Sequence, residues 1–277
     1  MVYLIIVSIL WSFSFGIIKY GLSGIDSGFV SLMRTLIAFI FFTSLTAYNF
    51  KRFVFDLKLI LIGAIQFGLM YVLYIQSYEF LPAYLVATFT ISTPIFIGLS
   101  SQLIEKNNFS VKGIFAVILV VAGSLMLRFN IVNPLEYWSG FFLIQCANFC
   151  FAIGQVMFKK WSSENSTTDI MNNFSQMFFG AVLVTSLFYF SNPINFELLS
   201  TSNLLALLFL GLISTGFGFL AWNIGTTMVS TEKLAIMNNL IIPIAVCNSY
   251  LFFGENIDLI LFLPGIFCFY FALKLTL

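Results

Sequence analysis

Long apolar runs, separated by short polar breaks, account for most of this chain of 277 residues. A helix needs about 20 mostly apolar residues to cross the hydrocarbon core of a bilayer, and many of these runs reach that length. Only 8% of the residues are charged, against about 25% in an average soluble domain. The sequence therefore predicts an all-α integral membrane protein whose partner is a lipid bilayer.

Charges and turn residues divide the chain into ten predicted transmembrane helices. No break between them is long enough to hold a soluble domain, so we expect residues 1–277 to form a single membrane domain. The predicted spans are residues 2–20, 28–48, 58–79, 83–104, 110–128, 137–158, 170–190, 203–226, 233–253 and 257–275.

The basic residues of the loops favour one side of the membrane. With the N-terminus in the cytoplasm, nine Lys and Arg fall on the cytoplasmic side and only Arg128 on the other. Cytoplasmic loops carry an excess of basic residues, so we expect both termini in the cytoplasm. A cleaved signal peptide is not expected, because no basic segment precedes the apolar stretch from Val2 to Ile18. The nine residues are Lys51, Arg52, Lys58, Lys106, Lys112, Lys159, Lys160, Lys233 and Lys274.

Several function classes are disfavoured by what the chain lacks. A net charge of +1 leaves no large basic face, so nucleic acid is not an expected partner. Histidine is absent and all four cysteines lie inside apolar runs, so we expect no metal site, disulfide framework or cofactor. An enzyme would need a nucleophile with a base, a metal set or paired carboxylates in a cleft, yet every acidic residue lies near a span end or in a loop. A channel would need charged rings or a carbonyl filter, and the sequence contains a motif for neither.

The two halves of the chain, residues 1–130 and 131–277, repeat one another. The fourth and ninth spans each carry a proline near the middle, Pro94 and Pro243. The first and sixth spans carry polar and aromatic residues at helical spacing. A repeat of five helices is inverted relative to its twin, which predicts a binding site near the bilayer midplane between the halves. The two stripes are Ser8, Trp11, Ser12, Phe15 and Lys19, and Gln145, Asn148, Ala152, Gln155 and Lys159.

Polar and aromatic residues within the spans are the candidates for substrate binding. Each proline deletes a helical hydrogen bond and frees the carbonyl four residues earlier, that of Thr90 or of Asn239. Freed backbone at this depth is tolerated where it lines a cavity. The alternative is a packing kink, and the amides could equally hold helices together. The predicted binding residues are Trp11, Phe15, Tyr74, Thr90, Asn148, Gln155, Trp222, Asn223, Asn238 and Asn239.

Lys19 and Arg34 are charged residues within spans, and both are expected toward the outer end, where Glu79 and Asp26 are also predicted. They could form an outer gate or a counter-charge for a carboxylate. Snorkelling with an outer ion-pair cluster is the alternative. No acidic residue lies in a span interior, so facilitated diffusion or exchange is favoured over proton symport.

The order and duplication of several short motifs resemble the EamA-type bacterial members of the drug/metabolite transporter superfamily. Ser12 departs from the family, which often carries glycine there. The resemblance implies a basket-like bundle of two inverted repeats, with a cavity built by spans 1, 3, 4, 6, 8 and 9. The residues that carry it are Leu10 to Gly16, Lys19, Arg34, Leu81-Pro82-Ala83, Pro94-Ile95-Phe96, Glu105-Lys106 and Ala122-Gly123, and then Gly211, Thr215, Pro243, Gly254-Glu255 and Gly265.

The resemblance also implies transport of small metabolites across the bacterial inner membrane, often the export of amino acids or amines. We therefore expect a multi-pass carrier, a monomer or weak homodimer, that exports small amphipathic amino acids, related carboxylates or amines by alternating access. The alternative is an uptake carrier for a nucleoside-like or cofactor-like metabolite, held against Trp and Tyr rings.

Overall fold

The computed structural model describes residues 1–48, 55–81, 83–128, 138–165, 170–189, 199–253 and 259–276. Helix fills almost all of these ranges, and none of the residues described forms a strand. The prediction of an all-helical protein is therefore confirmed.

The first half of the chain folds into helices that are broken at two places. One break is a π-helical segment, η1, and the other is a short 3-10 turn, η2. The elements are α1 (Val2–Gly21), α2 (Ser27–Tyr48), α3 (Leu57–Gly63), η1 (Ala64–Leu69), α4 (Met70–Phe80), α5 (Ala83–Phe89), η2 (Thr90–Ser92), α6 (Thr93–Ile104) and α7 (Val111–Arg128).

The second half is broken in the corresponding places, by a π-helical segment, η5, and by a turn between α12 and α13. The elements are α8 (Trp138–Glu164), α9 (Ile170–Tyr189), α10 (Thr201–Leu208), η5 (Phe209–Phe217), α11 (Gly218–Thr227), α12 (Thr231–Asn238), α13 (Ile241–Phe253) and α14 (Leu259–Leu275).

Five continuous helical stretches of the described chain are long and apolar enough to cross a membrane. They are Ser27–Tyr48, Leu57–Phe80, Leu85–Ile104, Trp138–Glu164 and Thr201–Thr227. Shorter apolar helical stretches, Val2–Ile18, Val111–Ser124 and Phe262–Leu275, accompany them. The count of ten spans stays a prediction.

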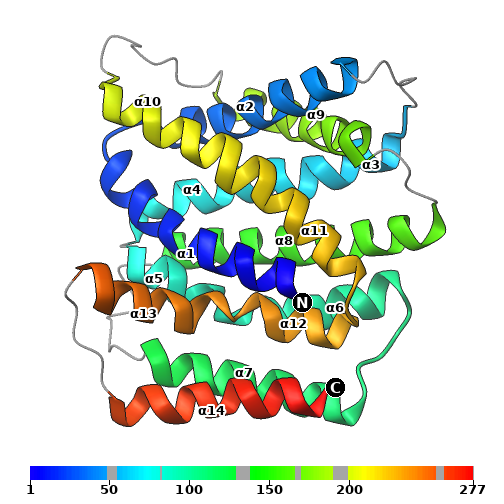
Figure 1. Cartoon of the computed structure of the whole chain (residues 1–277), viewed down its shortest axis with the longest axis vertical. Coiled ribbons are helices and arrows are strands. Elements are labelled where there is room, and N and C mark those ends of the chain that lie inside the picture. Colours follow the sequence, from blue (N-terminus) through cyan, green and yellow to red (C-terminus); the bar gives the residue numbers. More distant parts are fainter. Residues whose placement is uncertain are drawn as a thin grey trace.

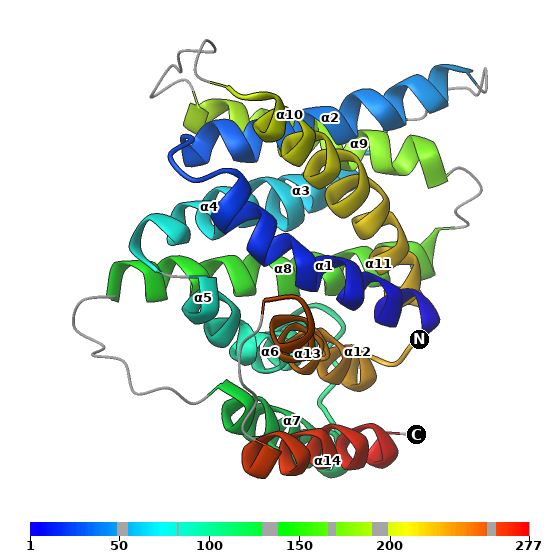
Figure 2. The same cartoon turned by 60° about the vertical axis from the view of Figure 1, so that its left-hand side comes forward.

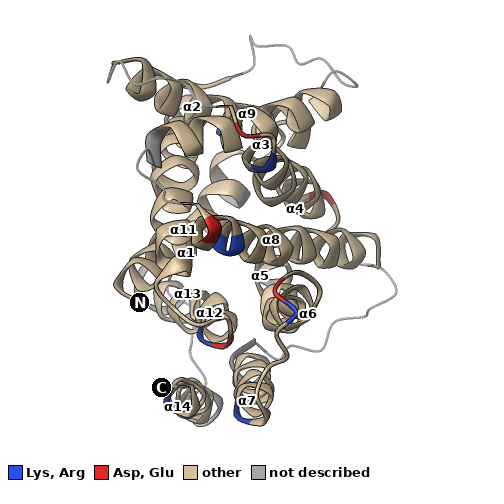
Figure 3. Ribbon diagram, turned by 90° about the vertical axis from the view of Figure 1, so that its right-hand side faces the viewer, with Lys and Arg blue, Asp and Glu red and all other residues tan. Residues whose placement is uncertain are grey.

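The helices form a bundle with α2 and α9 at one edge and α7 and α14 at the other (Figure 1). Between these edges lie α1, α4, α8 and α11, and turning the molecule shows α12 beside α6 (Figure 2). The start of α1 and the end of α14 lie at the same end of the bundle (Figure 1). Figure 3, which faces that end, shows basic residues on α3, α7, α8 and α12.

Polar residues stop the backbone from fraying where several of these helices begin. The carboxylate of Asp56 accepts a hydrogen bond from the Lys58 amide at the start of α3, 2.8 Å away. Ser200 and Asn203 form a reciprocal capping box at the start of α10, and Ser230 caps α12. Such caps satisfy amides that have no partner within the helix.

Two glycines allow α3 and α9 to pack with their backbones in contact. A Cβ at Gly63 would overlap the carbonyl of Met177, and one at Gly180 would overlap the carbonyl of Ile60. Small residues permit such close approach between membrane helices, where apolar surface alone does not drive association.

The prolines start new helices and do not kink continuous ones. Pro94 is the second residue of α6, and Pro243 is the third residue of α13. Proline fits the first turn of a helix, where its missing N–H would have no partner. The expectation that Thr90 and Asn239 carry free carbonyls is therefore wrong. The carbonyl of Thr90 accepts the Thr93 amide and hydroxyl, and that of Asn239 accepts the Ile242 amide at 3.1 Å.

Candidate binding cavity

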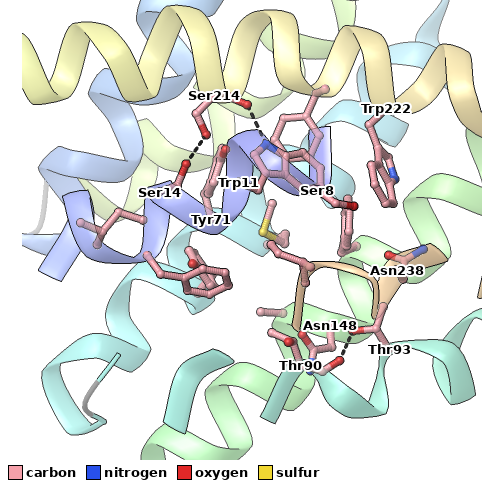
Figure 4. A pocket seen from close by; sticks show the side chains of 18 of the residues that line it. Ser8, Trp11, Ser14, Tyr71, Thr90, Thr93, Asn148, Ser214, Trp222 and Asn238 are labelled. Atoms are coloured by element: carbon pink, nitrogen blue, oxygen red, sulfur yellow. Dashed lines mark hydrogen bonds between the residues drawn. The ribbon is translucent and has the colours of Figure 1, made fainter. Parts of the chain in front are cut away.

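A cavity lies between the two halves of the chain, where α1 faces α4, α8, α11 and the breaks at η2 and after α12 (Figure 4). Its volume is about 110 Å³. The predicted residues that line it are Trp11, Phe15, Tyr74, Thr90, Asn148, Trp222 and Asn238, together with Arg34.

Other lining residues were not among the predicted binding residues. Helical periodicity does mark Ser8, in the polar stripe of the first span, and Tyr71, in the aromatic run Phe67-Tyr71-Tyr74-Tyr78. Ser214 lies in the π-helical η5, and no sequence pattern marks it. The remaining ones are Ser14, Ile18, Met70, Thr93, Ala147, Phe151, Phe219 and Ile241.

Three of the predicted binding residues lie behind the cavity wall. Gln155 accepts hydrogen bonds from the indole N–H of Trp222 at 2.9 Å and from the amide of Asn238 at 3.1 Å. Asn223 is bonded to Gln66. Asn239 donates to the carbonyl of Ile91 at 2.9 Å. These amides position helices or lining residues, as the helix-to-helix alternative supposed.

The prolines themselves are not part of the lining either. The prolines affect the cavity through the helix breaks. At the break between α5 and α6, the carbonyls of Phe89, in α5, and Ile91, in η2, accept hydrogen bonds from side chains. Asn148 donates to the carbonyl of Phe89 at 2.8 Å, and Gln145 donates to the same oxygen at 3.1 Å. Two side-chain amides of α8 thus supply hydrogen bonds to the backbone at the break between α5 and α6.

Aromatic rings form one wall of the cavity. The rings of Trp11 and Trp222 lie 4.9 Å apart and tilted by 32°, and Phe219 lies 5.0 Å from Trp11. The indole N–H of Trp11 donates to the backbone carbonyl of Ser214 in η5, at 2.9 Å. Trp11 is therefore held in place by that bond, and its flat face can pack against a ring of a bound molecule.

Another part of the wall offers hydrogen-bond acceptors. The hydroxyls of Ser8, Thr90 and Thr93 all donate to backbone carbonyls three or four residues earlier, at 2.7–2.8 Å, so these hydroxyls are left to act as acceptors. The amide nitrogen of Asn148 is also used, by Phe89 and by Ser92. Figure 4 shows Thr90, Thr93 and Asn148 together on the side of the cavity away from Tyr71.

Arg34, on α2, is the one charged residue among the described cavity-lining residues. It is 2% exposed. Its Nη2 donates to the Tyr71 hydroxyl at 2.8 Å and its Nε donates to the Thr215 hydroxyl at 3.1 Å. Its Nη1 has no hydrogen-bond partner in the structure. The guanidinium carbon also lies 4.2 Å above the Tyr71 ring.

The other predicted gating residues lie apart from this cavity. Glu79 lines a second pocket, together with Asp26 and Tyr78, near the turn between α1 and α2. Ile18 borders both pockets, and the Tyr74 and Tyr78 hydroxyls, one in each, are hydrogen-bonded at 2.8 Å. The side chain of Lys19 lies outside the described residues.

Comparison with known proteins identifies the family of this chain. The EamA-like transporter family matches residues 1–129 and again residues 138–276. The chain belongs to this family. It is therefore a membrane transporter, and the prediction that it is not an enzyme is confirmed by the family and its relatives.

Relatives match over most of their own length. A protein of Pseudomonas aeruginosa called "Probable biotin transporter" is 34% identical over 263 residues, which are 93% of this chain and 90% of that protein. The "Biotin transporter" of Escherichia coli strain K12 is 34% identical over 247 residues, 88% of this chain and 81% of that protein. That of Salmonella typhimurium is 33% identical over 249 residues, with the same coverage.

A solved crystal structure has the same fold, with a TM-score of 0.80 over 99% of this chain and 96% of that one. At 11% sequence identity, it supports the fold alone.

The expectation of amino-acid or amine export is overturned by these relatives. Their names give biotin, a cofactor, as the cargo. The family resemblance could not have distinguished an amino-acid cargo from a cofactor. The shared motifs reflect the helical bundle, whereas the choice of cargo depends on the side chains that line the cavity. The alternative expectation, a carrier for a cofactor-like metabolite, fits the relatives better.

Proposed function

We propose that this protein is a carrier that takes up biotin, or a cofactor-like carboxylic acid close to it, by alternating access. The observation that carries the proposal is the similarity to biotin transporters along nearly the whole chain. The identity is about a third over most of both proteins.

The cavity wall suits the chemistry of biotin. Biotin has a fused ring system with a cyclic urea, whose N–H groups need acceptors, and a sulfur-containing ring with apolar faces. The acceptor side at Thr90, Thr93 and Asn148 supplies the first need. The aromatic side at Trp11 and Trp222 supplies the second.

The proposed architecture is two inverted repeats of five spans, residues 1–130 and 131–277. The family's double match supports it. So does the packing of the second predicted span on the seventh, α2 on α9, and of the fifth on the tenth, α7 on α14. The π-helical breaks η1 and η5 fall in the third and eighth predicted spans. Repeats of this kind rock against one another around a fixed central site.

The proposed orientation places both termini on the cytoplasmic side of the bacterial inner membrane. The start of α1 and the end of α14 share the end of the bundle that carries basic residues (Figure 3). At that end Lys159 donates to the Val229 carbonyl at 2.6 Å and to the Thr231 hydroxyl at 2.9 Å. We infer an outward-facing state, since these bonds close the cytoplasmic end.

The test is uptake of radiolabelled biotin into proteoliposomes that contain the purified protein. We expect saturable uptake that excess unlabelled biotin abolishes and that Trp11→Ala reduces at least about tenfold, because a stacking face for the ring is lost. Trp138→Ala is the matched control, since Trp138 is exposed at the start of α8 and does not line the cavity. Uptake no greater than in protein-free liposomes would refute the proposed cargo.

A further inference from the structure

The guanidinium of Arg34 is buried in the cavity wall, and no described residue forms an ion pair with it. Its hydrogen-bond partners, Tyr71 and Thr215, are both neutral, and they bond to each other through their hydroxyls at 2.8 Å. Nη1 has no hydrogen-bond partner among the residues that the structure describes, although the residue is only 2% exposed. A buried charge is costly unless it is paired, so an anion is the ligand that this site favours.

We propose that Arg34 binds the carboxylate of the cargo and selects acids over their neutral analogues. This proposal rests on the proposed function, because it assigns a part of the cargo to a part of the same cavity. Nη1 and the unused N–H of Nη2 form the end-on fork that binds a carboxylate through two parallel hydrogen bonds. Thr215 takes the N–H of Nε and Tyr71 takes the other N–H of Nη2, so they hold the fork in a fixed direction.

The charge of the cavity points to a monoanion. Arg34 is the one charged group among the lining residues that the structure describes, so one negative charge neutralises it. A phosphate dianion would leave a surplus charge buried in an apolar wall. The acceptor side at Thr90, Thr93 and Asn148 would repel a second anionic group. The cavity thus has a donor end for a carboxylate and an acceptor side for N–H groups.

A purely structural role for Arg34 is the competing explanation. The same hydrogen bonds tie α2 to α4 and to η5, and they would do so without any ligand. A structural arginine should affect acid and neutral ligands equally. A carboxylate-binding arginine should affect only the acid, so the ratio of the two affinities separates the explanations.

The experiment measures equilibrium binding of biotin and of biotinamide, its neutral amide, to purified wild-type protein and to Arg34→Gln, with melting curves to verify folding. We expect the wild type to prefer biotin by about 10- to 100-fold, as charge-assisted hydrogen bonds would give, and Arg34→Gln to bind both equally. Lys112→Gln is the matched control, since it removes an exposed positive charge outside the cavity and should keep the wild-type ratio.

An unchanged preference in folded Arg34→Gln, or no preference in the wild type, overturns the proposal. If Arg34→Gln does not fold, Arg34→Lys replaces it, because lysine keeps the charge without the fork. A severalfold fall in the ratio of biotin affinity to biotinamide affinity then supports the proposal, and an unchanged ratio overturns it.

Failure of the cargo assignment is recognised separately. If the wild type binds neither biotin nor biotinamide, the proposed function fails, and lipoate with lipoamide and pantothenate with pantothenol are tested in the same way. A preference for either acid that Arg34→Gln removes upholds the role of Arg34. Absence of such a preference in both pairs overturns it.

Discussion

The side-chain amides of Gln66 and Asn223 face each other and exchange hydrogen bonds of 2.9 and 3.4 Å. Gln66 lies in η1 and Asn223 in α11, so the pair joins the third predicted span to the eighth. Both side chains are fully buried. A reciprocal pair of this kind leaves neither amide unsatisfied in an apolar interior, and it ties together two helices that carry residues of the cavity.

We expect Asn223→Leu to lower the free energy of unfolding by about 1–3 kcal/mol, because it leaves the buried amide of Gln66 without a partner. The double variant Gln66→Leu with Asn223→Leu should lose less than the sum of the single variants. Reversible denaturation in detergent measures this. Biotin affinity of the folded Asn223→Leu protein should stay within about threefold of wild type, and a loss of binding comparable to that of Trp11→Ala would instead place Asn223 in the site.

The predicted helices and the membrane class followed from features that repeat along the chain. Hydropathy is a local property, so it locates apolar helices well. Proline likewise acts on its own helix, and the breaks near Pro94 and Pro243 lie where their positions suggested. The sequence also showed that Trp11 and Asn148 belong to polar stripes, and both line the cavity.

Which amides reach the cavity could not be predicted, because that depends on partners distant in the sequence. Gln66 and Asn223 are separated by 157 positions, and Asn239 and Ile91 by 148. Helical periodicity predicts the face of the helix on which an amide lies. It does not predict which residue of another helix packs against that face. The π-helical segments add to the problem, since each shifts the face of every later residue in its helix.

Asn148 and Gln145 offer a matched pair of variants. Both donate to the carbonyl of Phe89, but only Asn148 lines the cavity. We expect Asn148→Ala to weaken biotin binding by about tenfold through the loss of a polar contact with the ligand. Gln145→Ala should leave binding nearly unchanged, since Asn148 still satisfies that carbonyl. Calorimetric titration measures both. Equal losses in the two variants would show that only the helix break is affected.

The contact of α3 with α9 leaves no room for a methyl group at Gly63. Gly63→Ala should lower the free energy of unfolding by about 1–3 kcal/mol, the usual cost of overpacking. Gly98→Ala is the control, because a Cβ there would meet the ring of Phe109 at an ordinary 3.5 Å. Thermal melting of the purified variants measures the difference. A Gly63→Ala protein as stable as Gly98→Ala would mean that the two helices can separate at little cost.

Lys159 joins α8 to the connection between α11 and α12 at the end of the bundle proposed to be cytoplasmic. Its ammonium donates to Val229 and Thr231, and the Thr231 hydroxyl in turn donates to the carboxylate of Glu105 at 3.0 Å. Thr231 therefore links this part of the second half to Glu105 of the first half. Alternating access requires that such contacts break when the cytoplasmic side opens.

We expect Lys159→Met to shift the population toward the inward-open state, because methionine keeps the apolar stem and removes these hydrogen bonds. A cysteine placed at Ser8, in the cavity, should then react faster with a membrane-impermeant maleimide added from the cytoplasmic side of oriented vesicles. Loss of about 1.4 kcal/mol from the closed state would raise the ratio of open to closed protein about tenfold. Lys112→Met, which removes an exposed lysine, should leave the labelling rate unchanged. Faster labelling from the opposite side would mean that Lys159 closes the outer end and that the proposed orientation is reversed.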